Sequence, residues 1–184
     1  MRMPTYKITP DETHPNDEFL IIGEAPGRQE DGIGPFLGAS GQALFNHFLT
    51  HAGVSRNKCH ITNTVPVRPP DNVFERLSEY GLSISAFADD LRRKVLSRKW
   101  TAVIVVGNKA LESVTGLGNI ESRRGSLLTD QWTNTQRVFP MIHPARLMRL
   151  DKARQRKDEM KKINQFTAAM LLDMQKLRHI LKED

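Results

Sequence analysis

Two short and wholly apolar segments, each followed by a glycine, constrain the fold of this 184-residue chain more than any other feature. The first covers residues 19–22 and precedes Gly23, and the second covers residues 102–106 and precedes Gly107. Continuous apolar runs of this length are typical of parallel strands that are covered on both faces. Both are far shorter than the roughly 20 residues that a membrane-spanning helix requires.

Helical patterns alternate with these strands and with two more. We expect further strands at residues 61–67, interrupted by Pro66, and at 138–142. Apolar spacing predicts helices over 40–52 with Ser40 as N-cap, over 84–95, over 108–115, and along the C-terminal residues from 163 to 181. This alternation predicts a layered α/β fold with a mainly parallel sheet. Residues 1–18 are expected to form an N-terminal arm, and residues 19–184 a single domain that ends in a long, basic, amphipathic helix.

The charge balance favours a polyanionic partner. Lys and Arg number 27 against 21 Asp and Glu, a formal net charge of +6. Nearly all of this excess lies in residues 146–162, which hold eight basic and three acidic side chains. Such a cluster is typical of a nucleic-acid contact, but composition alone leaves a solvated helix face equally open.

The single cysteine and the amino-terminal residues indicate a reducing, intracellular setting. Cys59 alone cannot form an internal disulfide or a multi-cysteine metal site. The first ten residues lack the apolar stretch of a secretory signal. We therefore expect a cytoplasmic protein with no membrane partner, and a monomer.

Unusual side chains follow the predicted strands. They are Glu24, Glu30, Phe36, Asn63 and His143. Ligands collect at the carboxyl ends of parallel strands, so we expect these residues to meet in one cleft. Each has a structural explanation by itself, because a carboxylate can cap its own turn and an amide or imidazole can form hydrogen bonds within a loop.

Several motifs resemble, in order, those of the uracil-DNA glycosylase superfamily, most closely its iron-sulfur or fourth family. They are GEAPG at 23–27, ED at 30–31, GPFLGASGQAL at 34–44, ITN at 61–63, RPP at 68–70, RRG at 123–125 and FPMIHPARLMR at 139–149. The resemblance implies a three-layer α/β/α sandwich around a central, mainly parallel four-stranded sheet. It also implies an intracellular, nucleoid-associated hydrolase of base excision repair. Such an enzyme cleaves the N-glycosidic bond of uracil, or of a related deaminated or modified base, flipped out of single- or double-stranded DNA.

The resemblance assigns four residues to the flipped base. Phe36 would stack on the base, and Asn63 would accept a hydrogen bond from its N3 and donate one to O4. His143 would donate a hydrogen bond to O2 as negative charge builds up on the departing base. Glu30 would lie near C5 and help to reject the thymine methyl group.

The same resemblance makes Glu24 the candidate for orienting water or supporting the cationic sugar. The best-known class of the superfamily has an aspartate in this loop, at the position where this chain has Ala25. The resemblance implies that Ala25 contacts the substrate. Leu147 or Met148 would insert as an apolar wedge when a duplex base is extruded. The DNA phosphates would be neutralised by Arg146, Arg149, Lys152 and Arg154.

Members of the iron-sulfur class bind a [4Fe-4S] cluster through four cysteines. This chain has Val67 at one of those positions, a residue near Ala86 at another, and no N-terminal pair. We therefore expect no cluster, no other cofactor and no metal. Apolar side chains of residues 67–96 are expected to support the part of the chain that holds the cluster in the iron-sulfur class. The absence of these cysteines leaves two other hypotheses open. The protein could excise a different base, or it could be a non-catalytic DNA-binding module that acts as a replication accessory or base sensor.

Overall fold

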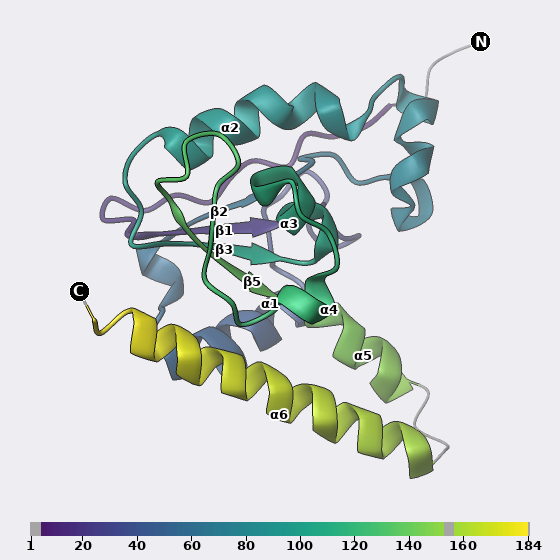
Figure 1. Cartoon of the computed structure of the whole chain (residues 1–184). Coiled ribbons are helices and arrows are strands. Elements are labelled where there is room, and N and C mark those ends of the chain that lie inside the picture. Colours follow the sequence, from purple (N-terminus) through teal and green to yellow (C-terminus); the bar gives the residue numbers. More distant parts are fainter. Residues whose placement is uncertain (1–4, 153–156, 184) are drawn as a thin grey trace.

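A five-stranded sheet forms the centre of the molecule, with strand order β2-β1-β3-β5-β4 (Figure 1). The computed structural model describes residues 5–152 and 157–183, apart from the side chains of 149–152 and 157–159. Four strands are parallel: β1 (Phe19–Gly23), β2 (Cys59–Asn63), β3 (Ala102–Val106) and β5 (Arg137–Met141). The fifth, β4 (Leu128–Thr129), is an antiparallel edge strand of two residues.

The predicted parallel sheet is confirmed, with two corrections. The four-stranded count missed β4, because a two-residue strand is too short to show a periodic pattern. The predicted strand at 61–67 begins instead at Cys59 and ends at Asn63. The chain then leaves the sheet, and Val65 and Val67 are buried in a separate apolar cluster.

Helices cover both faces of the sheet and make the expected three layers (Figure 1). Alternate strand residues point to opposite faces, so Ile21, Ile61 and Ile104 share one core cluster while Leu20 and Val103 lie in the other. The first face is covered by α1 (Ala39–Ala43), η1 (Leu44–Phe48), η2 (Leu49–Ala52) and α6 (Lys157–Ile180). The second is covered by α2 (Ala88–Leu96), α3 (Asn108–Thr115) and α4 (Ile120–Arg123).

Short helices complete the connections. They are η3 (Arg56–Lys58), η4 (Pro70–Asn72), η5 (Phe74–Tyr80), η6 (Ile84–Phe87) and α5 (Ala145–Lys152). The expected helix over 108–115 is confirmed. The one expected over 40–52 is broken into α, π and 3-10 turns, and its N-cap is Gly38 without a side-chain hydrogen bond, rather than Ser40.

The long helix α6 is anchored to the sheet by apolar packing and one buried ion pair. Met170, Met174 and Leu177 are fully buried, as the apolar spacing predicted. Arg124 Nη1 donates to both carboxylate oxygens of Asp173 at 2.6 Å, and Asp173 is 1% exposed. The RRG motif therefore connects the end of α4 to α6.

The described part of the N-terminal arm packs along β2. Glu12 and Ile61 exchange two backbone hydrogen bonds of 2.8 and 2.9 Å. Asp11 accepts hydrogen bonds from His60, Thr62 and Lys94, the last of which lies in α2. Burial by itself would raise the pKa of Asp11, but these hydrogen bonds outweigh it and lower the pKa from 3.8 to about 2.

We expect Asp11→Asn to lower the free energy of unfolding by about 2 kcal/mol at neutral pH. The pKa of Asp11 is lower in the folded state than in the unfolded state. The contribution of Asp11 to the free energy of unfolding is therefore complete above pH 4 and is lost as the pH falls towards 2. Urea unfolding at a series of pH values should therefore show the two proteins converging over that interval. Asp89→Asn, at an exposed α2 position, is the matched control; a pH-independent gap between wild type and Asp11→Asn would contradict the assignment.

Candidate active site

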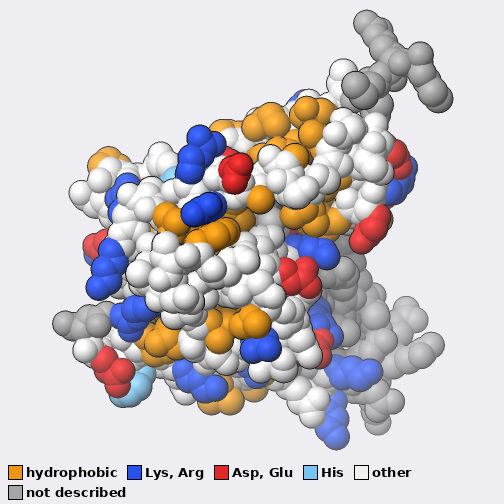
Figure 2. Space-filling model, turned by 45° about the horizontal axis from the view of Figure 1, so that its top comes forward, with side chains coloured by type: hydrophobic (Ala, Val, Ile, Leu, Met, Phe, Trp, Pro, Cys, Tyr) orange, Lys and Arg blue, Asp and Glu red, His pale blue; other side chains and the backbone are white. Residues whose placement is uncertain are grey.

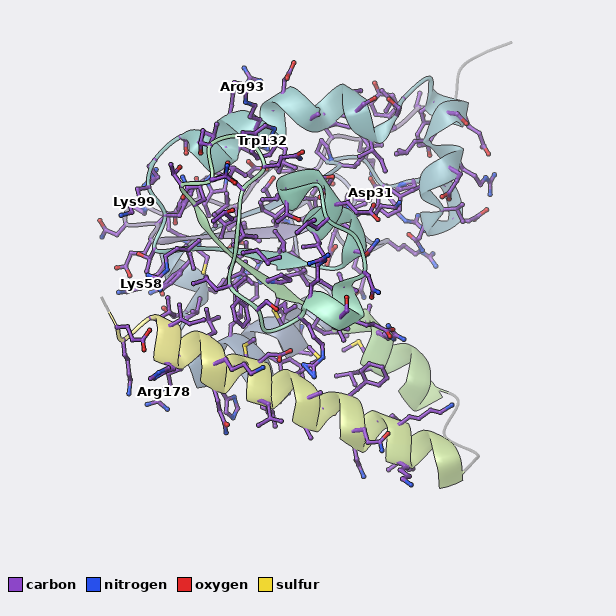
Figure 3. The ribbon with its side chains drawn as sticks, viewed as in Figure 1. Asp31, Lys58, Arg93, Lys99, Trp132 and Arg178 are labelled. Carbon is purple, nitrogen blue, oxygen red and sulfur yellow. The ribbon has the colours of Figure 1, made fainter. Side chains whose placement is uncertain are left out.

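A cleft of about 610 Å³ opens at the edge of the sheet where the parallel strands end. Figure 3 helps to locate this edge, because Lys58 and Lys99 lie just before β2 and β3, whereas Asp31 lies in the loop beyond β1, on the opposite side. Four segments line the cleft: residues 24–30, 38–40, 69–74 and 143–148. The strand-end motifs that the sequence singled out therefore meet, as expected for a parallel sheet.

Asn63 and Phe36 meet at the base of this region, across the end of β1. Asn63 is paired with Gly23, and a Cβ atom at Gly23 would lie 2.4 Å from Asn63 Oδ1 and 2.7 Å from Phe36 Cζ. Only glycine at position 23 lets the amide and the ring approach so closely. Both side chains lie behind the residues that line the open cleft, since Asn63 is 7% and Phe36 3% exposed.

The buried amide of Asn63 has no hydrogen-bond partner among the residues that the structure describes. A buried amide without partners costs roughly 1–3 kcal/mol, so native proteins rarely retain one without a reason. An amide offers both a donor and an acceptor. This position is therefore suited to a ligand with the complementary pair.

His143 follows β5 and lies against Phe36. The two rings are stacked with centroids 5.7 Å apart and an angle of 23° between their planes. His143 Nδ1 accepts a hydrogen bond from the backbone N–H of Ala145 at 3.1 Å. In the neutral imidazole this assigns the ring proton to Nε2, which makes Nε2 the donor.

Glu24 lines the cleft and is fixed by helix α3. Its Oε1 accepts from the backbone N–H of Lys109 at 3.0 Å, and a Cβ atom at Gly107 would lie 2.5 Å from its Cδ. The carboxylate therefore caps the N-terminus of α3, where the helix dipole favours negative charge, and does not cap its own turn. Within the described residues Oε2 has no partner, which leaves it available to a water molecule in the cleft.

Glu30 joins two of the loops that line the cleft. Its Oε2 accepts from Gly27 N at 2.8 Å and its Oε1 from Gly38 N at 3.3 Å. Both carboxylate oxygens are therefore used to hold the backbone. Ala25 also lines the cleft and packs against the apolar cluster of Val65 and Val67.

The two candidates for the apolar wedge differ in where they point. Met148 lines the cleft, whereas Leu147 packs against the core beneath α6. The Arg146 guanidinium forms an ion pair with Glu121 and lies 4.8 Å from the centre of the Phe166 ring. Arg146 therefore connects α4, α5 and α6, a structural role that the sequence did not predict.

The other predicted DNA contacts, Arg149, Lys152 and Arg154, lie outside the described side chains. Figure 2 shows other Lys and Arg side chains spread over one face of the molecule, with apolar side chains between them. Sequence reasoning also missed Arg56, which contacts the backbone of Phe36. No motif signals this contact, because Arg56 lies 20 residues further along the chain, at the start of the short helix η3.

Comparison with known proteins identifies the family of the chain. A family model of the uracil DNA glycosylase superfamily matches residues 10–168. The type-4 uracil-DNA glycosylase of Archaeoglobus fulgidus is 30% identical over 138 residues, which cover 71% of this chain and 67% of the relative. The corresponding enzyme of Sulfurisphaera tokodaii is 30% identical over 143 residues, covering 74% and 63%, and that of Thermotoga maritima is 28% identical over 169 residues, covering 90% and 79%.

The chain therefore belongs to the uracil-DNA glycosylase superfamily, and its similarity is to type-4 members. The expectation of a hydrolase of the N-glycosylase class with DNA as its partner is confirmed at the level of the family. The chain spans only about two thirds of the length of several of these relatives. No helix among the described residues is long and apolar enough to cross a membrane.

The residues present do not fit the cysteine-bound cluster of the iron-sulfur class. Cys59 is fully buried, donates to Ser55 O at 3.2 Å, and has its pKa raised to about 12, chiefly by burial, which disfavours the thiolate that iron requires. Val65, Val67 and Leu77 form an apolar cluster at the position of the predicted ligand loop. Tyr80 packs against this cluster, and the Tyr6 ring from the N-terminal arm lies 5.4 Å from the Tyr80 ring.

We expect the purified protein to contain no stoichiometric iron or sulfide and no visible absorption band, because four thiolates are lacking. Iron and acid-labile sulfide should be assayed after expression under anaerobic, iron-replete conditions. Cys59→Ser is the matched control and should have the same spectrum. Stoichiometric iron in the wild type that Cys59→Ser loses would contradict the prediction.

Proposed function

We propose that this protein excises uracil from DNA by hydrolysing the N-glycosidic bond of a nucleotide that is turned out of the strand. The observation that carries the proposal is the buried, unpartnered amide of Asn63 beside the rings of Phe36 and His143. Uracil presents N3–H as a donor and O4 as an acceptor, which match the two ends of this amide. Cytosine presents the reverse pattern, which the amide would match only with its oxygen and nitrogen exchanged.

Entry of the base requires the imidazole of His143 to move off the Phe36 ring, because Phe36 and Asn63 are almost fully buried. The base then stacks on Phe36 and pairs with Asn63. Met148, which lines the cleft, then fills the gap left in the strand.

Cleavage breaks the bond between the sugar C1′ and the base N1, and both electrons remain with the base. The Nε2–H of His143 donates to O2, where part of the resulting negative charge develops. Glu24 supports the cationic sugar and holds a water molecule through Oε2. The water oxygen bonds to C1′ and its proton is released, while the base is protonated from solvent.

The base preference of Asn63→Asp tests this proposal directly. A panel of oligonucleotides carrying uracil, hypoxanthine, a thymine mismatch or hydroxymethylated cytosine should yield abasic product only from uracil with the wild type. Asn63→Asp should lose most uracil activity and gain relatively on cytosine, because a carboxylate accepts but does not donate. Unchanged uracil activity would remove Asn63 from the base pocket, and product from another base alone would assign that base as the substrate.

His143→Ala should separate chemistry from binding. Loss of one donor to developing charge typically slows a reaction about 10²- to 10³-fold, so single-turnover excision should fall by at least about a hundredfold. Affinity for uracil-containing DNA should change by only a few-fold. Circular dichroism provides the folding control. An equally active variant would contradict the role of His143, and a wild type that binds such DNA tightly without product would support the non-catalytic binding module.

A further inference from the structure

Arg56 holds the backbone of Phe36 from behind the pocket. Arg56 Nη1 donates to Phe36 O at 3.0 Å, and Nη2 donates to Pro35 O at 2.8 Å. Phe36 has a φ of +53°, a conformation that residues with a side chain rarely adopt. Such a conformation persists only where the surroundings hold it, and Arg56 supplies two hydrogen bonds at this point.

The guanidinium of Arg56 is itself held in place. Its Nε donates to Glu12 Oε1 at 2.8 Å and its Nη2 to Glu12 Oε2 at 2.6 Å. Its Cζ lies 4.6 Å from the centre of the Phe45 ring, and Phe45 meets the Phe36 ring edge-on at 6.4 Å. Glu12 is fixed in turn by its backbone pairing with Ile61 in β2. An unbroken series of contacts therefore leads from β2 to Phe36.

The opposite side of the Phe36 carbonyl is closed by Gly41 in α1. A Cβ atom at position 41 would lie 1.9 Å from Phe36 O, so the glycine backbone packs directly on this peptide. The carbonyl is thus confined between Gly41 and Arg56. Because this peptide is held on both sides, the direction of the Phe36 Cα–Cβ bond is constrained, and with it the position from which the ring extends.

We propose that Arg56, together with Glu12, is a positioning residue that fixes the backbone of Phe36 and so the position of the ring on which the base stacks. This inference rests on the proposed function. The Arg56 guanidinium donates to Glu12 and to the backbone of Pro35 and Phe36, so it acts through Phe36 and not on the base itself. The planar guanidinium donates four hydrogen bonds here, to Glu12 and to two carbonyls, whereas the ammonium of lysine has only three donors and no planar arrangement of them.

Arg56→Lys keeps the charge and removes this geometry. We expect single-turnover excision of uracil at saturating DNA to slow by at least about tenfold, because misplacement of a reacting group by about 1 Å can cost 10²-fold. Affinity for DNA without uracil should not change. Lys58→Ala is the matched control, because Lys58 lies in the same short helix η3 as Arg56. This change breaks only the exposed ion pair of Lys58 with Glu18 and should leave the rate unchanged.

A double-mutant cycle distinguishes positioning from a general loss of structure. In a Phe36→Leu background the stacking ring is absent, so Arg56→Lys should slow excision little further. If the two changes multiply instead, Arg56 does not act through Phe36 and the inference is wrong. All rates are measured well below the unfolding temperature of each variant.

Glu12→Gln provides a second variant that keeps Arg56 and its carbonyl contacts while weakening their support. Glu12→Gln should also slow excision, but by less than Arg56→Lys. If Arg56→Lys does not fold, an unchanged excision rate in Glu12→Gln overturns the inference. The proposed function fails separately: a wild type that releases no base would refute it. An active wild type with an equally active Arg56→Lys would refute only the positioning role.

Discussion

The parallel pairing of β1 with β2 in the register Gly23–Asn63 is the constraint on which the site depends. It brings the end of each strand to the same edge, and the hydrogen atom of Gly23 leaves room for an amide and an aromatic ring. Any side chain at that position would overlap both. The amide of Asn63 is therefore held by the end of the sheet itself, while Phe36 reaches it from a loop.

Backbone N–H groups fix the carboxylates around the cleft. Glu24 is bound by the first turn of α3, and Glu30 is bound by Gly27 and Gly38. Such bonds hold each carboxylate in one orientation. A carboxylate oriented in this way suits the proposed reaction, in which the sugar becomes cationic.

Apolar side chains pack together in the region where the resemblance to the iron-sulfur class would place cluster ligands. Val65, Val67 and Leu77 are buried together, Tyr80 packs against them, and Tyr6 of the N-terminal arm contacts the Tyr80 ring. Apolar packing can hold a loop as a cluster does, provided that another segment closes it from solvent. The arm has this second role, and it also supplies Glu12 to Arg56.

The sequence by itself determined the parallel sheet, its helical layers and most residues of the site, because continuous apolar runs and strand-end motifs are local signals. It placed Asn63, Phe36 and His143 together only through the general rule that parallel strands share a carboxyl edge. Tertiary structure alone decided that Glu24 caps α3, that Leu147 packs inward while Met148 faces the cleft, and that Arg56 reaches Phe36. These outcomes depend on which residues, distant in the chain, compete for the same hydrogen bond or buried volume, and no local pattern encodes that competition.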